Sequence, residues 1–132
     1  TRSFFKRNLE MNGNSVVLDT NIVLYLLGGD QVLAELLYQK KLYLSFISQL
    51  ELLGFKGITS KQQIEISKFI QDCIVIDIND EIKQDVILLR KTSKLKLPDS
   101  IVLATARFLS LPLITSDVDF KTTGFPEIII YE

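Results

Sequence analysis

The chain has 132 residues and a mass of 15.0 kDa, with 47% hydrophobic and 23% charged residues, which is enough for one folded domain with its own core. It has no histidine and one cysteine, Cys73, which excludes histidine-based catalytic triads, zinc sites built from histidine or cysteine, and an internal disulfide. The net charge of −1 gives no overall nucleic-acid signature, and no apolar run is long enough to span a membrane.

The chain alternates strand-like and helix-like segments. A turn signal at 12–14 precedes the first strand, and the apolar positions of 20–27 recur at helical spacing until Gly28 and Gly29 stop them. We expect strands over 15–18, 41–46, 73–78, 113–115 and 127–131. We expect helices over 20–27, 30–39, 48–53, 60–71, 79–92 and 98–109. Strands separated by helices predict an α/β fold whose parallel sheet is covered on both faces.

Several helix starts carry capping signals. N-caps are expected at Asp30, Ser60 and Asn79. The Ser48-x-x-Glu51 pattern is typical of a capping box, so we expect Ser48 to open its helix. Pro98 is expected at the favoured first position of the helix over 98–109.

Residues 11–132 are predicted to form a single domain, because no linker rich in proline, glycine or serine interrupts them. Residues 1–10 lack clear periodicity, and we expect either a cloning-derived tail before a native start at Met11 or a flexible N-terminal arm. The single cysteine is typical of a reducing compartment, so a cytoplasmic location is expected.

Four acidic residues that are far apart in sequence are predicted to meet at one edge of the sheet. Asp19 directly follows the first strand, and Asp117 follows the fourth strand by one residue. Glu51 lies in the first turn of the helix after the second strand, and Asp99 begins the helix that leads back to the fourth. The carboxyl ends of parallel strands share one edge, where open α/β sheets bind ligands.

Each acid also has a purely structural interpretation as a helix cap or a residue near the positive end of a helix dipole. Capping predicts acids at any helix start, whereas a catalytic site predicts them together at one edge. Two like charges 4 Å apart cost about 4 kcal/mol at an effective dielectric near 20, so such a cluster needs protonation or a cation. No basic residue stands beside these acids in the sequence, which favours a hard cation such as Mg²⁺ or Mn²⁺.

Four segments resemble the acidic motifs of the PIN-domain nucleases, in the expected order: LDTNI at 18–22, SQLELLG at 48–54, LPDSIVLATA at 97–106 and TSDVDF at 115–120. The chain looks closest to the VapC-type toxins of bacterial toxin–antitoxin pairs, and the matches span 16–131. The resemblance implies a single three-layer α/β/α domain with a parallel sheet of about five strands. It also implies an endoribonuclease that hydrolyses RNA with a metal-activated water.

The resemblance also assigns roles to particular residues. It implies that Mg²⁺ or Mn²⁺ is ligated by Asp19, Glu51, Asp99 and Asp117. Asp119 matches a second acid of the last motif and is a further expected metal ligand. Asn21 and Thr115 match polar positions that orient the carboxylates or the attacking water. Ser116 departs from the family, which often has a basic residue there.

A basic run leads into Asp99 and consists of Arg90, Lys91, Lys94 and Lys96. These residues either bind RNA phosphates beside the metal site or are solvent-exposed cations at the end of a helix, where the helix dipole favours positive charge. Phe55 and Lys56 are further candidates for RNA contact, although a phenylalanine is more often a core residue. Arg107 either contacts RNA as well or forms a structural ion pair. The helices over 22–37 are rich in leucine, and most of these apolar residues are expected in the core. The resemblance implies that apolar residues left exposed there contact a second copy of the chain in a homodimer or an antitoxin partner.

Two alternatives remain at the level of the sequence. A PIN-like module that binds RNA or protein without cutting it would carry the same motifs. A phosphoaspartate enzyme also places an aspartate at a strand end, but its common pattern needs a second aspartate where this chain has Asn21.

Overall fold

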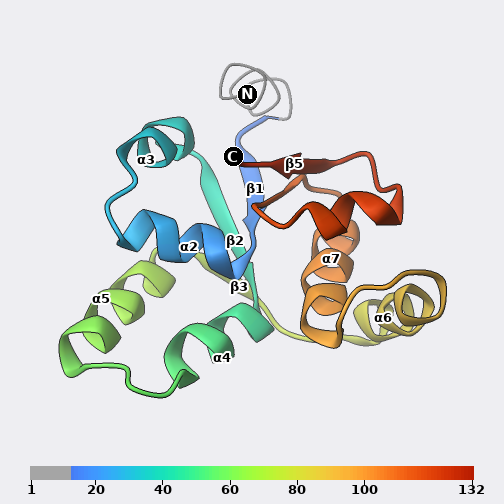
Figure 1. Ribbon diagram of the computed structural model, residues 1–132, viewed down its shortest axis with the longest axis horizontal. Helices are drawn as coiled ribbons and strands as arrows, with labels where there is room; N and C mark the ends of the chain where they lie inside the picture. Colours follow the sequence, from blue (N-terminus) through green and yellow to red (C-terminus); the bar gives the residue numbers. More distant parts are fainter. Residues whose placement is uncertain (1–12) are drawn as a thin grey trace.

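Five parallel strands form the centre of the computed structural model, which describes residues 13–132 (Figure 1). The expected N-terminal tail and Met11 lie outside the described residues. The strands are β1 (Ser15–Leu18), β2 (Lys41–Ser45), β3 (Ile74–Ile76), β4 (Leu113–Thr115) and β5 (Ile128–Ile130). Their order in the sheet is β3-β2-β1-β4-β5, and every neighbouring pair is parallel.

Helices connect the strands in the order that the sequence predicted. They are α2 (Thr20–Leu27), α3 (Gln31–Leu37), α4 (Phe46–Gly54), α5 (Ser60–Gln71), α6 (Asp80–Thr92), α7 (Leu97–Leu109) and the 3-10 helix η1 (Val118–Thr123). None of the helices within 13–132 is long and apolar enough to cross a membrane.

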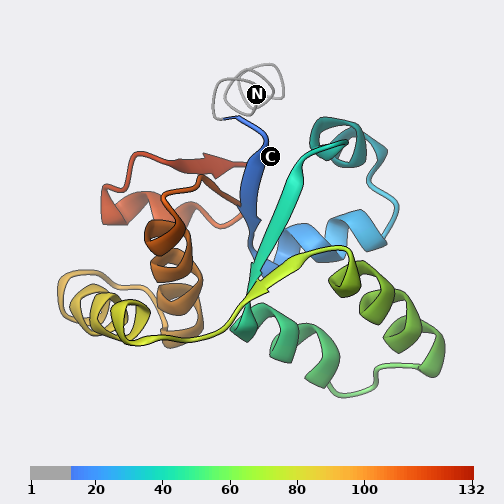
Figure 2. The ribbon, with the colours of Figure 1, turned by 180° about the vertical axis from the view of Figure 1, so that it is seen from behind.

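The helices cover the two faces of the sheet, with a separate apolar core on each face. Successive side chains of a strand point to opposite faces, so Val16 and Leu18 of β1 face one core while Val17 faces the other. The first core packs against α2 to α5, and the second against α6 and α7, which lie on the opposite side in both views (Figures 1 and 2). The predicted three-layer α/β/α fold with five parallel strands is therefore confirmed.

The strand order reverses direction at β1, because β2 and β3 extend the sheet on one side of it and β4 and β5 on the other. In open α/β sheets such a reversal opens a crevice at the carboxyl ends of the two central strands. Here those ends are Leu18 of β1 and Thr115 of β4, which lie on paired neighbouring strands. The topology therefore places the residues after β1 and β4 at the ligand-binding edge.

The predicted start of α4 at Ser48 was wrong. The helix begins at Phe46, with Ser45 as its N-cap accepting a hydrogen bond from the Ile47 amide at 3.3 Å. Ser48 is therefore a fully buried residue inside the helix, and no Ser48–Glu51 capping box exists. The predicted third strand was also too long, because β3 is an edge strand whose pairing with β2 ends at Ile76.

The remaining caps are partly as predicted. Asp30 and Asn79 cap α3 and α6, accepting hydrogen bonds from the backbone three residues on. For α5 the cap is Thr59 rather than Ser60, since Thr59 and Gln62 form a reciprocal capping box with distances of 3.1 and 3.0 Å. Pro98 is the second residue of α7, which begins one residue earlier than predicted.

The capping box of α5 can be tested by comparing two adjacent hydroxyl residues. Thr59→Ala removes the acceptor of the Gln62 amide, and we expect it to lower the free energy of unfolding by about 1 kcal/mol. Ser60→Ala is the matched control, expected to stay within about 0.5 kcal/mol of wild type because Ser60 makes no cap. Urea unfolding measures both, and a larger loss for Ser60→Ala would contradict this assignment.

Candidate active site

Asp19 is the buried centre of the site. It follows β1 directly and caps α2, and its side chain is only 6% exposed. Its two carboxylate oxygens accept hydrogen bonds from the Thr20 amide at 2.9 Å and from the Thr115 hydroxyl at 2.7 Å. Burial raises the pKa of Asp19 despite these two bonds, and the charges of Glu51 and Asp117 raise it further.

Thr115 joins the two central strands at their carboxyl ends. It is the last residue of β4 and is fully buried. Its hydroxyl donates to Asp19 and accepts from the backbone amide of Asp117 at 3.0 Å. One hydroxyl therefore fixes the position of Asp19 relative to the chain that carries Asp117.

Asp117 and Asp119 differ in their surroundings. Asp117 caps η1, and its carboxylate accepts from the Asp119 amide at 2.9 Å. Asp119 is exposed, and its charge is not among those that raise the pKa of Asp19 or Asp99. The structure thus brings Asp117 to the site and leaves the side chain of Asp119 at its margin.

Asp99 lies in the first turn of α7 and is half-buried. Burial raises the pKa of its carboxyl to about 6, and the charges of Asp19, Asp117 and Glu51 raise it too, while Lys96 opposes them. Residues from β1, α4, α7 and the end of β4 therefore converge at one edge, as the sequence predicted.

Glu51 reaches the site from α4 on the opposite layer to α7, and its side chain is exposed. Its Oε1 atom accepts a hydrogen bond from the Thr20 hydroxyl at 2.8 Å, and that hydroxyl also lies 2.9 Å from Ser48 Oγ. Sequence patterns did not predict these contacts of Thr20 and Ser48. Thr20 adjoins Asp19 and Ser48 lies one helical turn before Glu51, but the Ser48-x-x-Glu51 spacing is also typical of a capping box.

The charge and donor type of this cluster fit a hard divalent cation. Within residues 13–132, none of the four acids forms an ion pair with a lysine or arginine. Their oxygen donors are those that Mg²⁺ and Mn²⁺ prefer. As they stand, no three acidic side chains of the described chain are close enough together to hold one ion. Closure of the side chains around a cation would offset the mutual repulsion of their charges.

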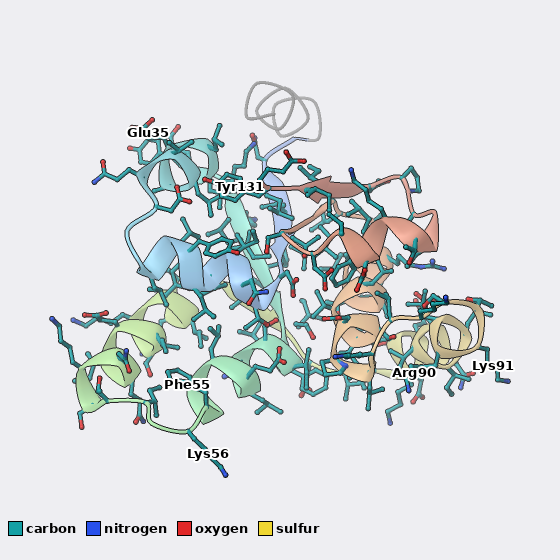
Figure 3. All side chains as sticks on the ribbon, viewed as in Figure 1. Glu35, Phe55, Lys56, Arg90, Lys91 and Tyr131 are labelled. Carbon is teal, nitrogen blue, oxygen red and sulfur yellow. The ribbon has the colours of Figure 1, made fainter. Side chains whose placement is uncertain are left out.

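The basic residues are arranged unevenly around the site. Lys96 immediately precedes α7, and its positive charge opposes the rise in the pKa of Asp99. Arg90 donates to the Leu95 carbonyl at 2.8 Å, so it braces the loop between α6 and α7. Lys91 and Lys94 are exposed, and Arg90 and Lys91 lie together near the α6–α7 end of the molecule (Figure 3).

The other candidates lie further out. Phe55 and Lys56 follow the distal end of α4 and are exposed (Figure 3). Asn21 is exposed and makes no side-chain hydrogen bond to the described part of the chain. Arg107 forms the predicted structural ion pair, with Asp85 at 2.9 Å, and its guanidinium also lies over the Phe125 ring.

The model of the PIN domain family matches residues 16–126, which include all four acids. The chain belongs to the PIN-domain family. PIN nucleases generally depend on divalent metal ions. A comparison with curated protein sequences gave no match.

Solved structures with this fold include VapC-type relatives, which confirms the resemblance seen in the motifs. A toxin–antitoxin complex from Klebsiella pneumoniae contains a chain 32% identical to this one, with a TM-score of 0.76, and the match covers 89% of this PIN domain and 98% of that chain. VapBC-1 from nontypeable Haemophilus influenzae is 25% identical, with a TM-score of 0.70 and coverage of 88% and 97%. VapBC2 from Rickettsia felis, bound to a promoter DNA fragment, is 22% identical, with a TM-score of 0.71 and coverage of 89% and 97%.

The repulsion within the site predicts a pH-dependent gain in stability on neutralising Asp99. An aspartate titrates near 3.9 when unfolded and Asp99 near 6 when folded, so the metal-free protein loses stability as pH rises from about 4 through about 6. Asp99→Asn avoids this loss. We expect the variant to be more stable than wild type at pH 7.5 by about 1 kcal/mol, after allowing for screening of a half-exposed group.

Urea unfolding in chelator at pH 4 and pH 7.5 measures this difference, which should vanish at the lower pH. Glu65→Gln on α5 is the control, because Glu65 is exposed and its charge is not among those that raise the pKa of Asp99. If Asp99→Asn were less stable than wild type at pH 7.5, the electrostatic account would be wrong.

Proposed function

We propose that this PIN domain is a metal-dependent endoribonuclease and the toxin of a toxin–antitoxin pair. The observation that carries the proposal is the meeting of Asp19, Glu51, Asp99 and Asp117 at the β1–β4 edge, where no basic residue of 13–132 forms an ion pair with them. The PIN family match and the toxin–antitoxin relatives support the same assignment. The single cysteine and an RNA substrate fit action in the cytoplasm.

The proposed mechanism divides the work among the four acids. A Mg²⁺ or Mn²⁺ ion held by them would supply an activated water and offset the charge that develops on the scissile phosphate. Asp19 is the fixed ligand, because Thr115 and the Thr20 amide hold both of its oxygens. Glu51 and Asp99 approach from opposite layers of the fold and can close on the ion from both sides.

Asp117 and Asp119 have lesser support as ligands. Asp117 is held by Thr115 and by the start of η1, which directs it to the same edge. Asp119 is proposed only as a ligand through water, since its side chain is exposed. Asn21 remains a proposed orienting residue that would act on the substrate or the attacking water rather than on an acid.

The RNA path is proposed to run along the basic loop between α6 and α7. Lys96 lies beside Asp99 and would hold a phosphate next to the metal, while Lys91 and Lys94 would hold the strand further out. Arg90 would act mainly by bracing this loop, because its guanidinium is bound to the Leu95 carbonyl.

Partner binding is proposed at the first two helices. Most of their apolar residues are core, but Leu24, Tyr25 and Tyr38 are 44%, 43% and 75% exposed. Tyr38 also belongs to a cavity of about 460 Å³, whose other lining residues are Leu26, Gly29, Asp30, Gln31, Ala34 and Glu35. An amphipathic antitoxin helix or a second copy of the chain would cover such a surface. The toxin–antitoxin relatives support the antitoxin, and a homodimer is the second proposed assembly.

The alternative is a PIN-like module that binds RNA without cutting it. RNA cleavage with added Mg²⁺ or Mn²⁺ separates the two. We expect wild type to cleave single-stranded RNA, Asp99→Asn to lose at least about 100-fold in rate, and Glu65→Gln to cleave like wild type. Circular dichroism would verify that each variant is folded. Equal cleavage by Asp99→Asn would refute this active site, and no cleavage by wild type with either metal would favour the binding module.

The same three proteins test the toxin assignment in cells. Induced expression of wild type or Glu65→Gln should arrest growth and create new RNA 5′ ends, whereas Asp99→Asn should do neither. Absence of arrest and of new ends with folded wild type would count against a toxin.

A further inference from the structure

The Thr20 hydroxyl lies between the start of α2, which directly follows Asp19, and helix α4, which carries Glu51. Thr20 is the first residue of α2 and is half-buried. Its Oγ1 atom is 2.8 Å from Glu51 Oε1 and 2.9 Å from the Oγ atom of Ser48, both on α4. Ser48 is fully buried and lies one turn before Glu51, on the same side of the helix. The threonine therefore links the start of α2 to α4.

The chemistry of these groups fixes the direction of the bond to Glu51. A carboxylate can only accept, and a hydroxyl carries one proton, so Thr20 gives that proton to Glu51. In the contact between the two hydroxyls, Ser48 is therefore the donor and Thr20 the acceptor. Ser48 is buried within α4, so it is a fixed donor to the Thr20 oxygen. The proton of the Thr20 hydroxyl then points to the Glu51 carboxylate.

Glu51 needs such a restraint more than the other acids. Its side chain is exposed and has three rotatable bonds, and ordering a glutamate side chain costs about 1.5–2 kcal/mol. The charges of Asp19 and Asp99 repel it, which favours rotamers that point into solvent. Within the described residues the hydroxyl of Thr20 is the one side-chain donor to Glu51, and it leaves Oε2 free of a protein partner.

We propose that Thr20 is a positioning residue that holds Glu51 toward the other three acids and leaves Oε2 available for a divalent cation. This inference rests on the proposed metal-dependent function. Thr20 restrains two acids by different atoms, because its backbone amide binds Asp19 and its hydroxyl binds Glu51. Replacing the side chain therefore tests the restraint on Glu51 while the bond to Asp19 is kept.

The test compares Thr20→Val, which keeps the shape of the side chain but loses the hydroxyl, with Thr20→Ser, which keeps the hydroxyl. Mn²⁺ binding is followed by electron paramagnetic resonance of the free ion, alongside thermal unfolding and the kinetics of RNA cleavage. We expect Thr20→Val to bind Mn²⁺ about 10-fold more weakly and to lower kcat with little change in KM. Thr20→Ser should restore both quantities to near the wild-type values.

Thr92→Val is the matched control, because Thr92 is an exposed threonine whose hydroxyl binds only a backbone carbonyl of α6. It should bind Mn²⁺ like wild type. A double-mutant cycle separates positioning from general destabilisation. In a protein that already carries Glu51→Ala, Thr20→Val should cause no further loss of Mn²⁺ affinity. An additional loss there would overturn the positioning role, since it would show that the hydroxyl acts elsewhere.

Two outcomes separate this inference from the function beneath it. If wild type binds Mn²⁺ and Thr20→Val binds it equally well, the role of Thr20 is overturned and the proposed function stands. If wild type itself neither binds Mn²⁺ nor cleaves RNA, both are overturned.

Discussion

Repulsion among four carboxylates at one edge of a parallel sheet is the constraint on which the site depends. Burial, and then the neighbouring charges, raise the pKa of Asp19 and Asp99 above the ordinary value, and no ion pair from the described chain offsets the charges. Neutral donors hold the acids instead: Thr115 binds Asp19 across the β1–β4 pair, and Thr20 binds Glu51 across α2 and α4. A hydroxyl orients a carboxylate without cancelling its charge, so the cluster keeps its capacity for a cation.

The fold makes this arrangement possible because its central strands are neighbours in space but almost a hundred residues apart in sequence. Asp19 and Thr115 are separated by 96 positions, yet their hydrogen bond is buried. Burial protects the bond from competition with water and is also the largest cause of the raised pKa of Asp19. The structure thus stabilises the geometry of the site while leaving its charge unrelieved, a condition suited to binding a metal and then a phosphate.

The sequence predicted the five strands, the two helical layers and the meeting of the four acids, because strand ends in a parallel sheet share an edge. Its errors have a local cause. The Ser48-x-x-Glu51 spacing is typical of a capping box, but tertiary packing began α4 at Phe46 and buried Ser48 instead. Thr20 was missed because its partner lies 31 positions away, which no local pattern reveals. Whether the acids already stand at metal-binding distance is likewise a matter of side-chain rotamers, which sequence patterns do not specify.

The most direct test of the account is a crystal structure of the protein soaked in Mn²⁺, with anomalous diffraction used to locate the ion. The account predicts a Mn²⁺ peak among Asp19, Glu51, Asp99 and Asp117, with the side chains drawn closer together than in the metal-free protein. Ordered acids with no peak between them, or Mn²⁺ bound only at another surface, would contradict it.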